Sequence, residues 1–144
     1  MKTIVAAVDF SDVTERVARY AVEMGAAFSA EVYLLHVEAP DPDFVGYEAG
    51  PQSVRDNVAQ SIGNDHQDMI ALRDQLQGHG CNVHGLVIQG PTAEKILSEA
   101  TRLESGLIVI GSHGYRPLLD VLLGSTSEAV LHKATQPVLV VPAK

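Results

Sequence analysis

The sequence contains one cysteine, Cys81, and no tryptophan. A single cysteine cannot form a disulfide within the chain, so we expect the protein to reside in a reducing compartment. We interpret Cys81 as a small apolar residue that packs before a strand, with a reactive thiol as the alternative. Aromatic residues make up only 5% of the chain. This scarcity argues against a platform of stacked rings that binds single-stranded nucleic acid.

Positive charge and long apolar runs are also scarce. The chain has 10 Lys and Arg residues against 18 Asp and Glu residues, a formal net charge of −8, and the basic residues are scattered singly. Such a chain repels a nucleic-acid backbone or an anionic membrane surface. No apolar run approaches the roughly 18–20 residues that span a bilayer, and the N-terminus lacks the pattern of a signal peptide. We therefore expect a cytoplasmic protein that neither binds nucleic acid nor inserts into a membrane.

Several motifs of known chemistry are missing too. There is no G-x-x-x-x-G-K-[ST], which excludes a P-loop NTPase in its usual form. No G-x-G-x-x-G follows the first predicted strand, which argues against a dinucleotide-binding domain, and no G-x-S-x-G nucleophile elbow is present. The 6 histidines form neither H-E-x-x-H nor a cluster with cysteine. We therefore expect no metal ion held by protein side chains.

The chain does contain the pattern of a single α/β domain over residues 1–144, and 46% of its residues are hydrophobic. Short apolar runs alternate with amphipathic helical patterns, which predicts a parallel sheet with helices on both faces. The predicted strands span 4–8, 32–37, 82–88, 107–110 and 137–141, and the predicted helices span 13–28, 52–77, 90–103 and 125–132. Ligands of such sheets bind at the carboxyl ends of the strands. The candidate positions are Asp9, Val37, Gln89 and Gly111.

Local signals add three expectations about the first half of the chain. Ser11 or Asp12 is expected to cap the first helix. The helix over 52–77 is expected to bury one apolar stripe, with His66 inside that stripe. The segment 38–51 is rich in Pro, Gly and Asp, which predicts a loop long enough to cover a site.

Residues 106–131 combine a strand, a glycine-bounded turn and a helix start. The turn is Gly111-Ser112-His113-Gly114, and Gly124-Ser125-Thr126 opens the helix nine residues later. Glycine permits close backbone approach to a phosphate, and the first N–H groups of a helix attract one. A simpler interpretation is open at this point, because Ser125 and Glu128 fit a capping box that satisfies a helix start without a ligand.

The spacing Gly111-x-x-Gly114-x9-Gly124-Ser125 resembles the G-x-x-G-x9-G-[ST] pattern of ATP-binding universal stress proteins. The stretches AVDFSD, LLHV, VIGSHG, LLGS and QPVLVVP also resemble that family, so the likeness covers the whole chain. It implies a universal stress protein domain with a doubly wound, five-stranded parallel sheet in the order 3-2-1-4-5, of the adenine nucleotide alpha hydrolase-like fold. It also implies ATP as the ligand, with ADP or AMP as alternatives.

The resemblance further implies a role for each matching residue. Asp9 would contact adenosine, with helix capping as its alternative role, and the backbone of Val37 would hold the adenine edge. The glycine turn would pass close to the ribose and phosphates, with His113 contributing its backbone, and the start of the last helix would bind the outer phosphates. The complete expected site is Asp9, Phe10, Ser11, Val37, Gly111, Ser112, His113, Gly114, Arg116, Gly124, Ser125, Thr126 and Ser127.

The chain departs from the family pattern where relatives commonly carry a basic residue after the second glycine. Tyr115 stands there, with Arg116 one step later, and Asp120 lies in the spacer. A triphosphate carries about four negative charges, so we expect Mg²⁺ or Mn²⁺ to accompany it, held mainly by the phosphates.

These observations favour a regulatory ATP-binding protein of the stress response. The nucleotide would order the loops 111–124 and 38–51 and so alter a surface that a protein partner reads. No catalytic base or nucleophile accompanies the glycine turn, so we expect slow ATP hydrolysis at most and assign no catalytic residue. The alternatives are an adenylating enzyme, whose H-I-G-H or S-G-G-x-D-S signature is absent, and a nucleotide-free structural dimer. The apolar last strand predicts a homodimer formed through a sheet edge, with a tetramer as the alternative.

Overall fold

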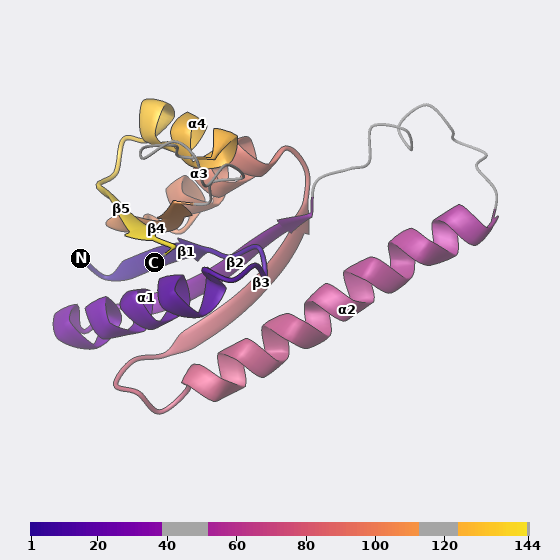
Figure 1. Cartoon of the computed structure of the whole chain (residues 1–144). Helices are drawn as coiled ribbons and strands as arrows, with labels where there is room; N and C mark the ends of the chain where they lie inside the picture. The colour runs from indigo at the N-terminus through magenta and orange to yellow at the C-terminus, as the bar shows by residue number, and fades with distance from the viewer. Residues whose placement is uncertain (39–51, 113–123, 144) are drawn as a thin grey trace.

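The computed structural model describes residues 1–38, 52–112 and 124–143, with the backbone alone described over 52–62. Strands and helices alternate along the chain as predicted, with ends that are shifted slightly (Figure 1). The strands are β1 (Thr3–Ala7), β2 (Glu31–Glu38), β3 (Val83–Gln89), β4 (Leu107–Ser112) and β5 (Val138–Pro142). The helices are α1 (Thr14–Phe28), α2 (Gln52–Leu76), α3 (Thr92–Arg102) and α4 (Ser125–Lys133).

The five strands form one parallel sheet in the order β3-β2-β1-β4-β5, which confirms the predicted order. Helices α1 and α2 cover one face of the sheet, and α3 and α4 cover the other (Figure 1). The chain winds outward from β1 to β3 and then crosses back to β4 on the other side of β1. The strand order therefore reverses between β1 and β4, where doubly wound folds bind their ligands.

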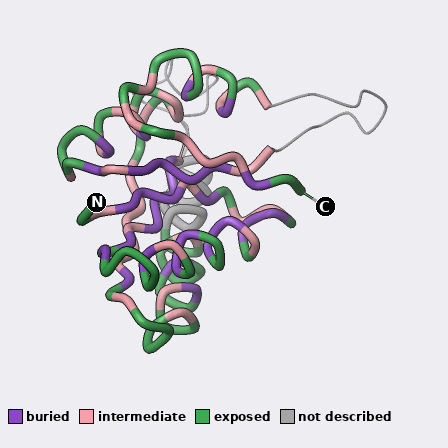
Figure 2. Tube along the Cα trace, turned by 90° about the vertical axis from the view of Figure 1, so that its left-hand side faces the viewer, coloured by how far each residue is buried: buried purple, intermediate pink, exposed green. Residues whose placement is uncertain are grey.

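Each face of the sheet carries its own core, because successive strand residues point to opposite faces. The buried core is concentrated in the strands and in the helix sides turned toward them (Figure 2). The core under α1 and α2 includes Ile4, Ala6, Val17, Ala21, Val32, Leu34 and Met69. The core under α3 and α4 includes Val5, Leu35, Val37, Ile96, Ala100, Ile108 and Val130. Adjacent residues of β2, such as Leu34 and Leu35, thus belong to the two different cores.

Helix α2 has 25 residues. No helix in the described part of the chain is both long and apolar enough to cross a membrane. Met69 and Leu72 are buried as predicted, but His66 is exposed, so its predicted place in the buried stripe is wrong. Asp65 lies one turn before Met69 and therefore falls near the centre of the stripe, whereas His66 is rotated by 100° toward solvent. The carboxylate of Asp65, and not the imidazole of His66, therefore faces the sheet.

Candidate functional site: a crevice where the strand order reverses

A cavity of ≈ 270 Å³ opens at the carboxyl ends of β1, β2 and β4, beside the first turns of α3 and α4. It lies at the reversal of strand order, where a doubly wound sheet is expected to bind its ligand. The predicted site residues that line it are Asp9, Val37, Gly111, Gly124, Ser125, Thr126 and Ser127. Segments distant in the sequence thus meet around one hollow.

The side chain of Asp9 organises the turn between β1 and α1. Its Oδ1 accepts hydrogen bonds from the Ser11 backbone N–H at 2.9 Å, the Ser11 hydroxyl at 2.5 Å and the Thr14 hydroxyl at 3.3 Å. Helix α1 begins at Thr14, and its N-cap residue Val13 makes no side-chain cap. The predicted cap by Ser11 or Asp12 is therefore wrong. The carbonyl of Ser11 accepts the Thr14 N–H at 3.0 Å, and its hydroxyl donates to Asp9.

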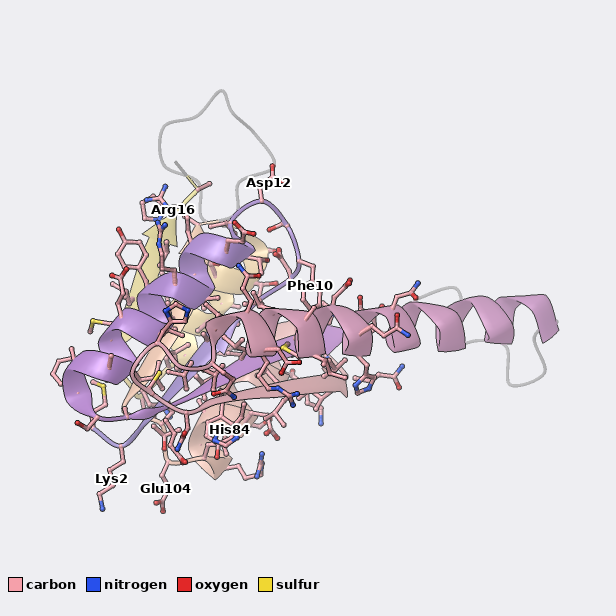
Figure 3. The ribbon with its side chains drawn as sticks, turned by 90° about the horizontal axis from the view of Figure 1, so that it is seen from below. Lys2, Phe10, Asp12, Arg16, His84 and Glu104 are labelled. Atoms are coloured by element: carbon pink, nitrogen blue, oxygen red, sulfur yellow. The ribbon has the colours of Figure 1, made fainter. Side chains whose placement is uncertain are left out.

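Phe10 lies against the opposite face of the sheet from the cavity. Its φ of 59° is in the left-handed region, which non-glycine residues seldom adopt. The ring packs against the imidazole of His36, with centroids 4.8 Å apart, on the side covered by α1 and α2 (Figure 3). Ser112 ends β4 beside Pro142. The predicted site residues His113, Gly114 and Arg116 lie outside the described residues.

Gly111 is required by the packing of α1 against β4. Strand β4 continues through Gly111 to Ser112, beyond the predicted end at Ile110. A Cβ on Gly111 would lie 2.7 Å from Cγ1 of Val13 and 3.3 Å from Cγ2 of Val17. The first distance is shorter than any real carbon–carbon contact of this kind, so α1 can approach β4 this closely only beside a glycine. The same residue lines the cavity.

The start of α4 faces the cavity without a side-chain cap. The N-cap residue is Gly124, and the helix begins at Ser125. The capping box considered for Ser125 and Glu128 is not formed, because Ser125 is already the first helical residue and Gly124 has no side chain to accept a bond. The Glu128 N–H bonds back to the Gly124 carbonyl at 2.9 Å. The N–H groups of the three residues before it lack an intrahelical partner and attract an anion.

Ser127 joins the start of α4 to the end of β4. Its hydroxyl donates a hydrogen bond of 2.7 Å to the Gly111 carbonyl, and the residue is buried. Because that hydroxyl proton is engaged, the donor that Ser127 can offer a phosphate in this arrangement is its backbone N–H. The bond holds the α4 N-terminus in place relative to the sheet.

The sequence analysis missed an apolar wall and one hydroxyl of the cavity. The wall comes from Leu35 of β2, Ile96 of α3 and Ile110 of β4, and Thr92 adds a hydroxyl at the start of α3. Strand alternation contained a signal for Leu35, which shares a sheet face with Val37, two residues on. No local signal pointed to Ile96, because only the crossover of α3 brings it to the cavity. Among the described residues that line the cavity, only Asp9 has an ionisable carboxylate, and none is basic.

Comparison with known proteins agrees with this arrangement. The universal stress protein family model matches residues 1–142. Universal stress protein MJ0531 of Methanocaldococcus jannaschii is 32% identical over 141 residues, which cover 97% of this chain and 81% of that protein.

Two solved structures share the fold. A universal stress protein in complex with cAMP superposes with a TM-score of 0.75 at 19% identity, over 99% of this chain and 98% of its own. A universal stress protein of Archaeoglobus fulgidus in complex with dAMP superposes with a TM-score of 0.72 at 22% identity, over 97% of both chains. With the family model matching almost every residue and the sheet order observed, the chain belongs to the universal stress protein family.

Proposed function

We propose that this protein binds an adenine nucleotide, with ATP as the expected form, in the crevice between β1, β4 and α4. The observation that carries the proposal is the uncapped N-terminus of α4, which borders a cavity with an apolar wall. A nucleotide has the matching two-part chemistry, since its base is flat and poorly hydrated and its phosphates are anionic. ADP and AMP fit the same description and are distinguished by the experiment below.

In the proposed complex the base occupies the apolar part of the cavity. Leu35, Val37 and Ile96 line this part, and their burial against a ring would be favourable at roughly 25 cal/mol per Å² of apolar surface. The backbone of Val37, near the end of β2, is the candidate for the adenine edge. The phosphates then extend toward Gly124 and the first N–H groups of α4. Universal stress proteins of this fold hold cAMP and dAMP, which supports an adenine nucleotide here as well.

The charge of the crevice favours a metal–nucleotide complex. Among the described lining residues, the ionisable side chain is the carboxylate of Asp9, which would not neutralise phosphate. Mg²⁺ or Mn²⁺ would offset the phosphate charge while bound mainly to phosphate oxygens and water. We accordingly expect ATP affinity to depend on the divalent ion.

We infer that nucleotide binding is regulatory and that hydrolysis is slow at most. Among the described residues that line the cavity, the carboxylate of Asp9 is the candidate general base. Its Oδ1 already accepts three hydrogen bonds within its own turn. The Ser127 hydroxyl is likewise engaged. Binding would instead order the strand-end loops and change a surface that a protein partner reads. Adenylating activity and a nucleotide-free structural role are the competing functions.

We also propose a homodimer formed through β5. This strand lies at one edge of the sheet and pairs with β4 on its inner side. Its outer edge presents backbone groups that a second copy can pair, and Val138, Leu139 and Val140 are each half-buried. A tetramer built from two such dimers is the alternative.

Mass spectrometry of small molecules released from the freshly purified protein tests the proposed ligand before any nucleotide is added. Calorimetric titration with ATP, ADP and AMP, each with and without Mg²⁺, then gives the preferred form. We expect saturable binding of one nucleotide per chain and ATP turnover far slower than exchange. The absence of binding by all three nucleotides would leave the structural role, and rapid release of pyrophosphate from ATP would favour the adenylating enzyme.

A further inference from the structure

Three side chains that commonly bind metal ions meet at the end of β2, on the opposite face of the sheet from the cavity. Nε2 of His36 lies 3.2 Å from Oε2 of Glu38 and 3.1 Å from Oδ2 of Asp65. The three candidate ligand atoms all lie within 4.8 Å of one another. His36 and Glu38 project from the same face of β2, and Asp65 comes from the sheet-facing side of α2.

The hydrogen bond of the other imidazole nitrogen orients Nε2 toward this cluster. Nδ1 of His36 lies 2.9 Å from the carbonyl oxygen of Val8, which can only accept a hydrogen bond, so Nδ1 carries a proton. In the neutral ring Nε2 then has a lone pair that faces two carboxylate oxygens. Three acceptors cannot satisfy one another, so the cluster takes up either a second ring proton, which makes an ion pair with the carboxylates, or a metal ion. A histidine that donates its distal N–H to a backbone carbonyl is the usual support for a metal ligand.

The spacing of the three atoms fits one small divalent ion. Zn–N distances are about 2.0–2.1 Å and Zn–O distances about 2.0–2.2 Å. Ligands at those distances lie about 3.4 Å apart at tetrahedral angles and about 3.0 Å apart at right angles. The observed separations of 3.1 and 3.2 Å from Nε2 fall between these values. Both carboxylate oxygens are therefore correctly spaced from Nε2, and they lie within 4.8 Å of each other, so a shift of one carboxylate toward the other completes the set.

The cluster is also partly dehydrated and held in place. The side chain of His36 is 10% exposed, those of Glu38 and Asp65 are 26% and 19% exposed, and the Phe10 ring packs against the imidazole. The hydrogen bond with Asp65 raises the pKa of Glu38, as does burial, while His36 opposes the shift. The two negative charges therefore destabilise each other in this position, and a divalent ion between them would relieve that repulsion.

We propose that His36, Glu38 and Asp65 bind a divalent transition-metal ion of the Zn²⁺ class, with water completing the coordination. One imidazole nitrogen and two carboxylate oxygens suit Zn²⁺, whereas Mg²⁺ prefers an all-oxygen octahedral set. The site is separate from the proposed nucleotide site, since Val37, between the two ligands on β2, faces the cavity on the other side of the sheet. The sequence pattern did not reveal it, because Asp65 is distant in the chain from the H-x-E pair.

The proposal is tested with chelator-treated protein in the absence of nucleotide. Zn²⁺ is titrated by calorimetry, and Co²⁺ is added as a spectroscopic probe whose visible absorption reports nitrogen and oxygen ligation. We expect one equivalent of either metal to bind, a higher melting temperature with Zn²⁺, and no comparable effect of Mg²⁺. Replacement of the α2 ligand, Asp65→Asn, should weaken Zn²⁺ binding more than 10-fold, and His36→Gln should do the same.

Two matched variants control for adventitious binding. Asp68→Asn removes an exposed carboxylate from the next turn of α2, and His84→Gln removes a histidine whose Nε2 lies 3.5 Å from Oε1 of Glu31. Both should bind Zn²⁺ like the wild type. The proposal fails if no stoichiometric Zn²⁺ binding occurs, or if Asp65→Asn, with an intact circular dichroism spectrum, binds as tightly as the wild type. It also fails if nitrogen chemical shifts show a doubly protonated His36 ring that excess Zn²⁺ leaves unchanged, because the cluster is then an ion pair.

Discussion

Replacement of Gly124 by Asp should make the protein more stable and a weaker nucleotide binder at the same time. Gly124 is the N-cap residue of α4, with φ of −58° and ψ of 158°, an extended conformation that Asp adopts without strain. Asp is among the best N-cap residues, because its carboxylate accepts the N–H of the second or third helical residue. In α4 those residues are Thr126 and Ser127. The new side chain would occupy the donors that we assign to phosphate.

The two effects have opposite signs and measurable sizes. An Asp N-cap in place of Gly raises the free energy of unfolding by roughly a few tenths of a kcal/mol. Loss of a hydrogen bond to a charged group costs about 1.5–3 kcal/mol of binding free energy, which corresponds to about 10- to 100-fold in Kd. Repulsion between the carboxylate and the phosphates adds to this loss. Because stability rises while affinity falls, unfolding of the variant could not explain the weaker binding.

Calorimetric titration with ATP and Mg²⁺, together with thermal unfolding of the ligand-free protein, measures both quantities. Gly124→Asn supplies a cap without charge, so its difference from Gly124→Asp gives the electrostatic part. Gly124→Ala adds a Cβ alone and reports the steric part. If Gly124→Asp melts at a higher temperature yet binds ATP as tightly as the wild type, the N-terminus of α4 does not hold the phosphates and the proposed site is wrong.

Three further predictions follow from individual contacts. Gly111→Ala should lower the free energy of unfolding by about 1–3 kcal/mol, because the new Cβ would overlap Val13; an unchanged denaturant midpoint would contradict the packing argument. Val140→Lys should convert the dimer to monomer in sedimentation velocity, and a dimer that persists with a native circular dichroism spectrum would exclude pairing through β5. Burial raises the pKa of the Cys81 thiol, so alkylation by iodoacetamide at pH 8 should be slower than that of free cysteine; an equal or faster rate would identify a reactive thiol.

The sequence alone determined the elements of this protein and their arrangement in the sheet. Apolar runs such as Leu107–Ile110 and the periodic pattern of α3 are local signals, because side-chain direction repeats every two residues in a strand and every 3.6 in a helix. The alternation of these elements required parallel strands and handed crossovers, and the likeness to a known family implied the strand order. The same patterns placed Asp9 after the end of the first strand and Gly124 before the start of the last helix, because each residue adjoins the end of an apolar run or the start of a helical pattern.

The tertiary structure alone decided which of these residues face one another. The sequence predicts Gly111 as a residue for phosphate approach, and the fold shows that Val13, the N-cap residue of α1, also excludes a side chain there. The Ser127 hydroxyl is engaged by a carbonyl 16 residues away. Asp65 meets His36 only because α2 crosses back over β2, and a rotation of 100° leaves its neighbour His66 in solvent. Local patterns encode the direction of a side chain relative to its own element, whereas contacts between elements depend on how those elements pack.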